Sequence, residues 1–203
     1  MVATLSKRQL FFRRIARRNF TAQVIEEESP SKQIFVDQCP CSWHPWKVPA
    51  VYRNLELIEL THRAREFLLL DVHEHQRDLV ASVAQSYSDA LFPPEDPNGP
   101  PLVWIRGVLR NNQPAGFVMC ADQTEQQKNP WLWRLLVDKS HQGFGVGTFA
   151  LNAVIERYRG LGMQKVLTAW HPGEGNAGDF YKKFGFIPTG EIIDDEIVAE
   201  LQL

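Results

Sequence analysis

Three glycines, Gly143, Gly145 and Gly147, lie within five residues of the stretch HQGFGVGTFAL at 141–151. The apolar run WLWRLLV precedes this stretch at 131–137, and a helix-like pattern follows it. A glycine inside a helix costs about 1 kcal/mol relative to alanine, so a glycine cluster at a helix start needs a reason. Unpaired backbone N–H groups and the positive end of the helix dipole both point into such a turn. The sequence therefore predicts a strand, an anion-binding turn and a helix in succession.

The pattern on both sides of this turn predicts an α/β (α+β) domain. After the glycines, apolar residues recur at Leu151, Val154, Ile155 and Tyr158, which is helical spacing, and the helix is expected to stop at Gly160. Because a strand, a helix and a strand in succession favour parallel strands, 131–137 and 165–170 should lie parallel in one mixed sheet with helices on its faces. The other expected elements are a helical segment at 62–92 capped by Thr61, a helix at 177–184, a hairpin of strands 102–109 and 115–121 joined through Asn111-Asn112, and strands at 51–60, 186–191 and 196–203.

Composition narrows the class of protein. Of the 203 residues, 44% are hydrophobic and 23% charged, as in soluble globular proteins, and no apolar run approaches the roughly 18–20 residues that span a bilayer. Three cysteines, Cys39, Cys41 and Cys120, suggest no disulfide framework and fit a reducing compartment. We therefore expect a cytoplasmic protein without a membrane partner.

Residues 1–50 differ from the rest of the chain. They carry eight Lys/Arg and four Asp/Glu, a net charge of +4, so residues 51–203 carry 22 − 8 = 14 basic and 24 − 4 = 20 acidic residues, a net charge of −6. We predict a basic extension and linker at 1–50 and one domain at 51–203. The extension is compatible with a poorly ordered tail, an organellar targeting peptide or a basic arm. The negative net charge of residues 51–203 argues against a nucleic-acid partner. Cys39, Cys41 and His44 are metal-capable, but their spacing is unlike that of zinc sites, and we predict no metal.

Three phosphate-binding designs compete for the glycine turn. A Walker loop needs a lysine after its last glycine, and none follows here. A dinucleotide fingerprint matches loosely through Gly145, Gly147 and Ala150, but the next strand lacks the acidic residue that should end it. The third design is the acetyl-coenzyme A loop Q/R-x-x-G-x-G/A, which Gln142 to Gly147 satisfy at every fixed position.

A downstream segment strengthens the third design. The stretch 180-FYKKFGFIPTGE-191 resembles the closing segment of the GNAT superfamily of N-acetyltransferases, at the expected distance from the glycine turn. The resemblance covers residue 51 to the C-terminus. Within the superfamily, the chain is similar to diamine or polyamine acetyltransferases at 116-GFVM-119, 131-WLWRLLVD-138, 173-GEG-175 and the C-terminal EIVAEL.

The resemblance implies the acyl-CoA N-acyltransferase fold, in which a central parallel strand pair splays apart within a mostly antiparallel sheet. Acetyl-coenzyme A, as acetyl donor, would place its pantetheine arm in this gap, bonded by the backbone of Leu135 and Val137. Its pyrophosphate would lie on N–H groups from Gln142 to Thr148. The implied cofactor-binding residues are Leu135, Leu136, Val137, Gln142, Gly143, Phe144, Gly145, Val146, Gly147, Thr148, Asn176, Tyr181 and Lys183.

The resemblance also implies that Tyr181 is the general acid that protonates the departing thiolate, with a backbone N–H of Leu135 or Leu136 stabilising the developing oxyanion. From the residues alone, without the motif, Tyr181 beside Phe180 and Phe184 is more typical of a packed helix face than of a catalytic residue. Where the superfamily often has an asparagine, this chain has Glu174, with Asn176 two residues later. Asn176 either replaces it or caps the short helix.

The acceptor is expected to be a primary amine of a small molecule, such as a diamine or polyamine. Asp78 and Asp89 are our candidates to hold its cationic tail. Candidate general bases are the charged or titratable residues Glu74, Asp78, Asp89, Asp122, His73 and His75. The alternatives are an acetyltransferase for an amino acid, antibiotic or protein amine, and a non-catalytic acetyl-coenzyme A sensor. A homodimer is left open.

Overall fold

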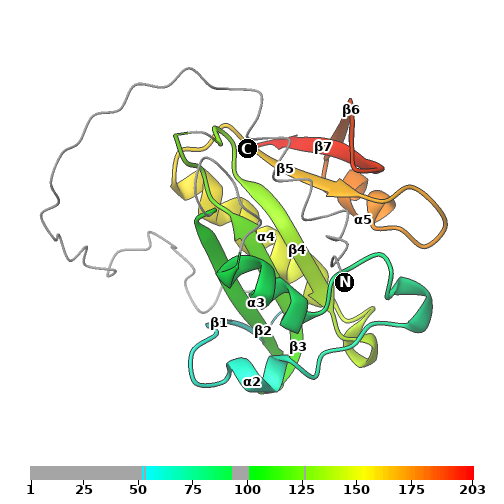
Figure 1. Ribbon diagram of the computed structural model, residues 1–203. Coiled ribbons are helices and arrows are strands. Elements are labelled where there is room, and N and C mark those ends of the chain that lie inside the picture. Colours follow the sequence, from blue (N-terminus) through cyan, green and yellow to red (C-terminus); the bar gives the residue numbers. More distant parts are fainter. Residues whose placement is uncertain (1–51, 53, 93–100, 126) are drawn as a thin grey trace, which may run out of the picture.

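The computed structural model describes residues 52, 54–92, 101–125 and 127–203. These residues form a seven-stranded mixed sheet with the strand order β1-β2-β3-β4-β5-β7-β6 (Figure 1). The expected extension at 1–50, with Cys39, Cys41 and His44, lies outside the described residues. The strands are β1 Leu55–Glu59, β2 Val103–Arg110, β3 Gln113–Ala121, β4 Trp131–Val137, β5 Lys165–Trp170, β6 Ile187–Ile193 and β7 Glu196–Gln202. The helices are α2 Ala64–Phe67, α3 Val83–Leu91, α4 Val146–Gly160 and α5 Gly178–Lys183, with short 3-10 turns η3 Glu74–Gln76 and η4 Lys139–His141.

Helices cover both faces of the sheet, as predicted, because β3 alternates its side chains between two cores. Val118 and Cys120 pack with α4 and α5 in one core, whereas Phe117 and Met119 pack with α2 and α3 in the other. All four side chains are buried. The open mixed sheet with helices on both faces is that of the acyl-CoA N-acyltransferase fold.

The predicted β-α-β unit is confirmed, and its two strands are paired only near their beginning. β4 and β5 run parallel but pair only at Trp131 and Leu167. Beyond that point the strands diverge, and they leave a gap in the centre of the sheet. The hairpin through Asn111-Asn112 is also confirmed, with both residues at positive φ (51° and 61°), as a two-residue turn requires.

The expectation of one helical segment at 62–92 is wrong in detail. The segment folds as α2, η3 and α3 with turns and irregular chain between them. Thr61 is not a helix cap: α2 begins after Arg63, and α3 is capped by Ser82, whose hydroxyl accepts from the Gln85 N–H. The break has a tertiary cause. The Asp71 carbonyl accepts from the Lys139 N–H and the Asp71 N–H donates to Asp138, so this segment is held against η4.

Within the described residues, no helix has both the length and the apolarity that crossing a membrane requires. No group of three or more His, Cys, Asp or Glu side chains gathers there in a metal-binding arrangement either.

Candidate active site

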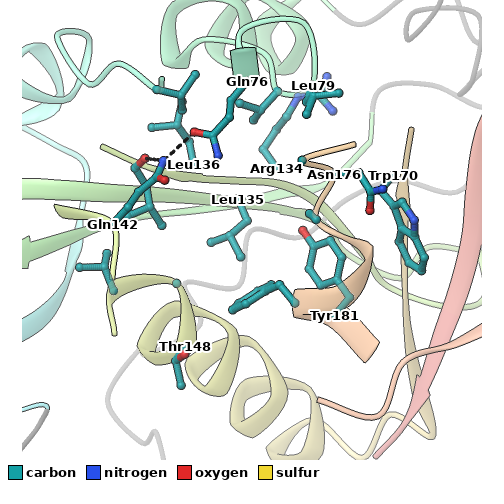
Figure 2. Close-up of a pocket in the computed structure, with 18 of the residues that line it drawn as sticks. Gln76, Leu79, Arg134, Leu135, Leu136, Gln142, Thr148, Trp170, Asn176 and Tyr181 are labelled. Carbon is teal, nitrogen blue, oxygen red and sulfur yellow. Dashed lines mark hydrogen bonds between the residues drawn. The ribbon is translucent and has the colours of Figure 1, made fainter. Parts of the chain in front are cut away.

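A cleft of about 570 Å³ opens where β4 and β5 diverge (Figure 2). Its floor is β4, one end is the glycine turn, and its far wall is the end of β5 with the loop into α5. Eleven of the predicted cofactor-binding residues line it: Leu135, Leu136, Val137, Gln142, Gly143, Gly145, Val146, Gly147, Thr148, Asn176 and Tyr181. Phe144 and Lys183 do not line it. Phe144 lies under the guanidinium of Arg110, 3.8 Å from its ring centroid, and Lys183 is exposed on α5.

The glycine turn has the geometry of an anion site. Gly143 and Gly145 both have φ of +80°, a conformation that side chains other than glycine rarely adopt. A Cβ at Gly143 would have no neighbour within 4 Å, so that backbone is open to a ligand. Gly145 caps the fifteen-residue helix α4 without a side-chain bond, and the first helical bond runs from the Phe149 N–H to the Gly145 carbonyl. The N–H groups of residues 146–148 precede that bond, so the helix does not use them.

The backbone of β4 turns toward the cleft because of a β-bulge. Met119 pairs with Arg134 and Cys120 with Leu132, so Trp133 is the extra residue on β4. Before the bulge, the Leu132 carbonyl faces β5 and accepts from the Thr168 hydroxyl.

After the bulge, the alternation of the strand is reversed. The Asp138 N–H donates to the carbonyl of Ala115 in β3. Alternation therefore directs the backbone of residue 136 toward β3 and that of Leu135 and Val137 toward the cleft. The Val137 carbonyl accepts from the Gln142 side chain, which itself lines the cleft, in agreement with this direction.

Tyr181 stands on α5 opposite β4. Its side chain is buried, and its ring packs 5.8 Å from Trp170, 5.4 Å from Phe180 and 5.5 Å from Phe186. Its hydroxyl nevertheless points into the cleft, toward Leu135 (Figure 2). The two interpretations offered by the sequence are therefore compatible, because the ring is a core residue and the hydroxyl belongs to the cleft.

Asn176 likewise has a structural role within the cleft wall. Its side-chain amide donates to the Gly173 carbonyl, and its oxygen accepts from the Gly178 N–H at the start of α5. The side chain lines the cleft, whereas Glu174 is exposed and does not.

Two contacts tie the segment before α3 to the glycine turn. The Gln142 side chain donates to the Gln76 amide oxygen at 2.8 Å (Figure 2). Asp71 accepts from Arg77 and Lys139, each at 2.9 Å, and these two cations hold the pKa of its carboxyl at about 2. The segment that closes one side of the cleft is thus fastened to the turn that would hold the pyrophosphate.

The acidic residues proposed for the acceptor do not face the cleft. Asp78 is exposed and outside its lining. Asp89 is buried, accepts from the Gln85 amide at 2.7 Å and pairs with Arg134 at 3.1 Å. The structure therefore does not support Asp89 as a ligand for a cationic tail, because its two oxygens serve the packing of α3 on β4.

The candidate bases are also outside the cleft. Asp122 accepts from Arg157 and from the Tyr158 hydroxyl, both at 2.7 Å, beside α4. Glu74, His73 and His75 are exposed on η3 and the residue before it, and none of them is among the described residues that line the cleft. The other residues that line the cleft were missed by reasoning from sequence: Val72, Gln76, Leu79, Val80, Trp133, Arg134, His141, Ala169, Trp170, His171, Gly175, Ala177 and Phe180. The position of His171 was a usable sequence signal, because this residue directly follows the second strand of the predicted β-α-β unit.

A divergent parallel strand pair with an anion-binding helix start at its mouth defines an acyltransferase of the coenzyme A-dependent class. The model of the acetyltransferase (GNAT) family matches residues 52–186, and the chain belongs to that family. It is an acetyl-coenzyme A-dependent N-acetyltransferase. A search of curated proteins finds no significant match.

Solved structures share the fold at low sequence identity. The PaiA N-acetyltransferase of Thermoplasma acidophilum, in complex with coenzyme A, has a TM-score of 0.56 at 12% identity over 73% of this chain and 99% of its own. Arabidopsis thaliana Naa50, in complex with the bisubstrate analogue CoA-Ac-MVNAL, has a TM-score of 0.53 at 19% identity over 74% and 99%. The ribosomal-protein-S18-alanine N-acetyltransferase of Escherichia coli has a TM-score of 0.52 at 16% identity over 73% and 93%.

Proposed function

We propose that the protein transfers the acetyl group of acetyl-coenzyme A to a primary amine whose attached group is apolar and uncharged. The amine attacks directly while both substrates are bound. The observation that carries this proposal is a single cleft with an anion site at one end, the Tyr181 hydroxyl near its middle and a mostly apolar wall along its other side.

The lining supports an acceptor with one positive charge at most. Apolar side chains from the segment before α3 and from β4 line this side of the cleft, namely Val72, Leu79, Val80, Trp133 and Leu136. Among the described residues that line the cleft there is no aspartate or glutamate. A diamine or polyamine would bring a second ammonium into this wall, where no carboxylate replaces its lost hydration. The lining therefore gives the expected polyamine acceptor no support.

The chemistry needs a donor for the thioester oxygen and an acid for the sulfur. The N–H of Leu135 is the better candidate donor of the two that we predicted, because alternation after the bulge directs it toward the cleft and that of Leu136 toward β3. Tyr181, on the opposite wall, is the acid that protonates the sulfur as its bond to carbon breaks. The glycine turn and the start of α4 hold the pyrophosphate.

A panel of three amines tests the function and its acceptor class. The probes are 2-phenylethylamine, the C-terminally amidated peptide MVNAL, whose sequence is taken from the Naa50 complex, and spermidine. We expect acetylation of at least one of the first two, with kcat/KM at least about tenfold above that for spermidine, the equivalent of about 1.4 kcal/mol. Thiol release and the mass of the product are measured together.

Two different failures are informative. If acetyl-coenzyme A does not bind in calorimetry, the function itself is wrong. If it binds and spermidine is the best acceptor, only the acceptor class is wrong.

A further inference from the structure

His171 is the first residue after β5, and its side chain lines the cleft together with Ala169 and Trp170. About a quarter of the side chain is exposed (25%), so the imidazole has access to solvent. None of the bases that the sequence suggested has this position.

The carboxylate of Glu196 contacts the His171 ring. Glu196 begins β7, which pairs with β5 so that Trp170 lies opposite Ile197 and His171 comes next to Glu196. The Glu196 Oε1 is 3.4 Å from the His171 Nε2, and the glutamate is buried (8% exposed) and outside the lining of the cleft. A carboxylate at Nε2 favours the tautomer that carries its proton there, which leaves Nδ1 as the basic nitrogen.

We propose that His171 is the general base of the acetyl transfer and that Glu196 is the residue that positions it. The proposal rests on the proposed function, because it names the group that takes the proton of the acceptor. An amine is mostly protonated near neutral pH, and its lone pair is unavailable until that proton leaves.

The protons balance with Tyr181 as partner. The ammonium of the acceptor gives one proton to His171 Nδ1, and the freed lone pair forms the bond to the acetyl carbon. As the carbon–sulfur bond breaks, Tyr181 gives its hydroxyl proton to the sulfur, and the second proton leaving the nitrogen restores the Tyr181 hydroxyl. His171 then releases its proton to solvent through its exposed edge.

Other titratable groups in the cleft are placed for other tasks. Arg134, from β4, is buried in its pair with Asp89. His141 lies at the opposite end, beside the glycine turn and 3.6 Å from Asp138. Tyr181, from α5, is the acid. His75, from η3, lies near Gly175 on the rim, because a Cβ at that glycine would be 3.5 Å from the His75 ring.

The first test is His171→Gln, with His62→Gln as the matched control. His62 is exposed and is not among the residues that line the cleft. With the best amine of the panel, we expect H171Q to lower kcat at pH 7 by about 10²- to 10⁴-fold without changing acetyl-coenzyme A affinity. The acid limb of its pH–rate profile should disappear, so that the rate rises steadily with pH. H62Q should match the wild type in all three measurements.

Glu196→Gln tests the positioning residue and gives a readout that does not depend on turnover. The 15N signals of the His171 ring are recorded by NMR and identified by their absence in H171Q. Loss of the carboxylate removes the acceptor of the Nε2 proton, so the ring should move toward the tautomer protonated at Nδ1, and kcat should fall.

The outcomes separate the two proposals. An inactive wild type overturns the proposed function and this inference with it. An active wild type with a fully active H171Q overturns the assignment of His171 as the base. A ring tautomer that E196Q does not change overturns the assignment of Glu196 as the positioning residue. If H171Q does not fold, the ring tautomer and kcat of E196Q decide.

Discussion

At the scale of single residues, the ring of Tyr181 packs in the core and its hydroxyl is the proposed acid, and the substitution Tyr181→Phe removes only the hydroxyl. The ring packs between Trp170, Phe180 and Phe186, whereas the hydroxyl points into the cleft. Tyr181→Phe retains the ring, so the free energy of unfolding should change little. Loss of a positioned acid should lower kcat by about 10²- to 10⁴-fold with nearly unchanged acetyl-coenzyme A affinity, measured by steady-state kinetics and calorimetry.

The control for this variant is Tyr87→Phe. The Tyr87 ring stacks edge-on against Phe117, its hydroxyl has no hydrogen-bond partner among the described residues, and it does not line the cleft. Its variant should retain the wild-type rate. A wild-type rate for Y181F as well would show that Tyr181 only packs.

The glycine turn gives a second prediction at this scale. Gly145→Val places a branched side chain at φ of +80°, at the start of α4 where the pyrophosphate is expected. We expect a loss of acetyl-coenzyme A affinity of at least about tenfold, or 1.4 kcal/mol, in isothermal titration. Gly160→Ala is the matched control, since a Cβ there would meet nothing within 4 Å. Wild-type affinity in G145V would contradict the anion site.

At the scale of elements, one buried ion pair holds α3 on β4. The side chains of Asp89 and Arg134 are 5% and 4% exposed, and Arg134 also donates to the Trp133 carbonyl. Asp89→Asn removes the carboxylate charge that faces this buried guanidinium, so it should destabilise the fold by roughly 3 kcal/mol or more. Asp78→Asn, on the exposed chain before α3, should stay within about 0.5 kcal/mol of the wild type. Urea unfolding of both variants measures the difference, and equal stabilities would contradict the role of the pair.

The elements also show what the sequence reveals and what it conceals. The β-α-β unit was predictable because its signals are local: helical spacing from Leu151 to Tyr158, and glycines at the turn. The break at 62–92 was not, because its causes are distant in sequence. The Phe67 ring packs so closely on β2 that a Cβ at Gly107 would lie 2.5 Å from it, and Asp71 is held by η4.

The residues of the candidate site also fall into two groups, those marked by local sequence signals and those brought together by contacts distant in sequence. Gln142 to Thr148 and Tyr181 lie in short motifs that a single stretch of sequence displays. His171 and Glu196 are on different strands, and only the pairing of β5 with β7 brings them together. The mostly apolar acceptor wall was missed for the same reason, since it joins residues before α3 to the bulge on β4.

At the scale of the whole molecule, every part of the proposed chemistry belongs to the sheet and helices that begin with β1. The family match starts at residue 52, and β1 pairs with β2 from Leu55 onward. The Tyr52 ring lies 5.7 Å from that of Phe149 in the first turn of α4, so residue 52 already contacts the helix that would hold the pyrophosphate.

We therefore predict that residues 1–50 are dispensable for catalysis. A chain that starts at Val51 retains Tyr52, the complete sheet and every described residue that lines the cleft. It should bind acetyl-coenzyme A with wild-type affinity and acetylate the best amine of the panel at a similar kcat. A chain that starts at Leu57 is the control, because it removes the first two pairs of β1 with β2 and the Tyr52 contact, and its melting temperature should fall. A large loss of activity on removing residues 1–50, or zinc in the full-length protein by elemental analysis, would instead make the basic segment part of the site.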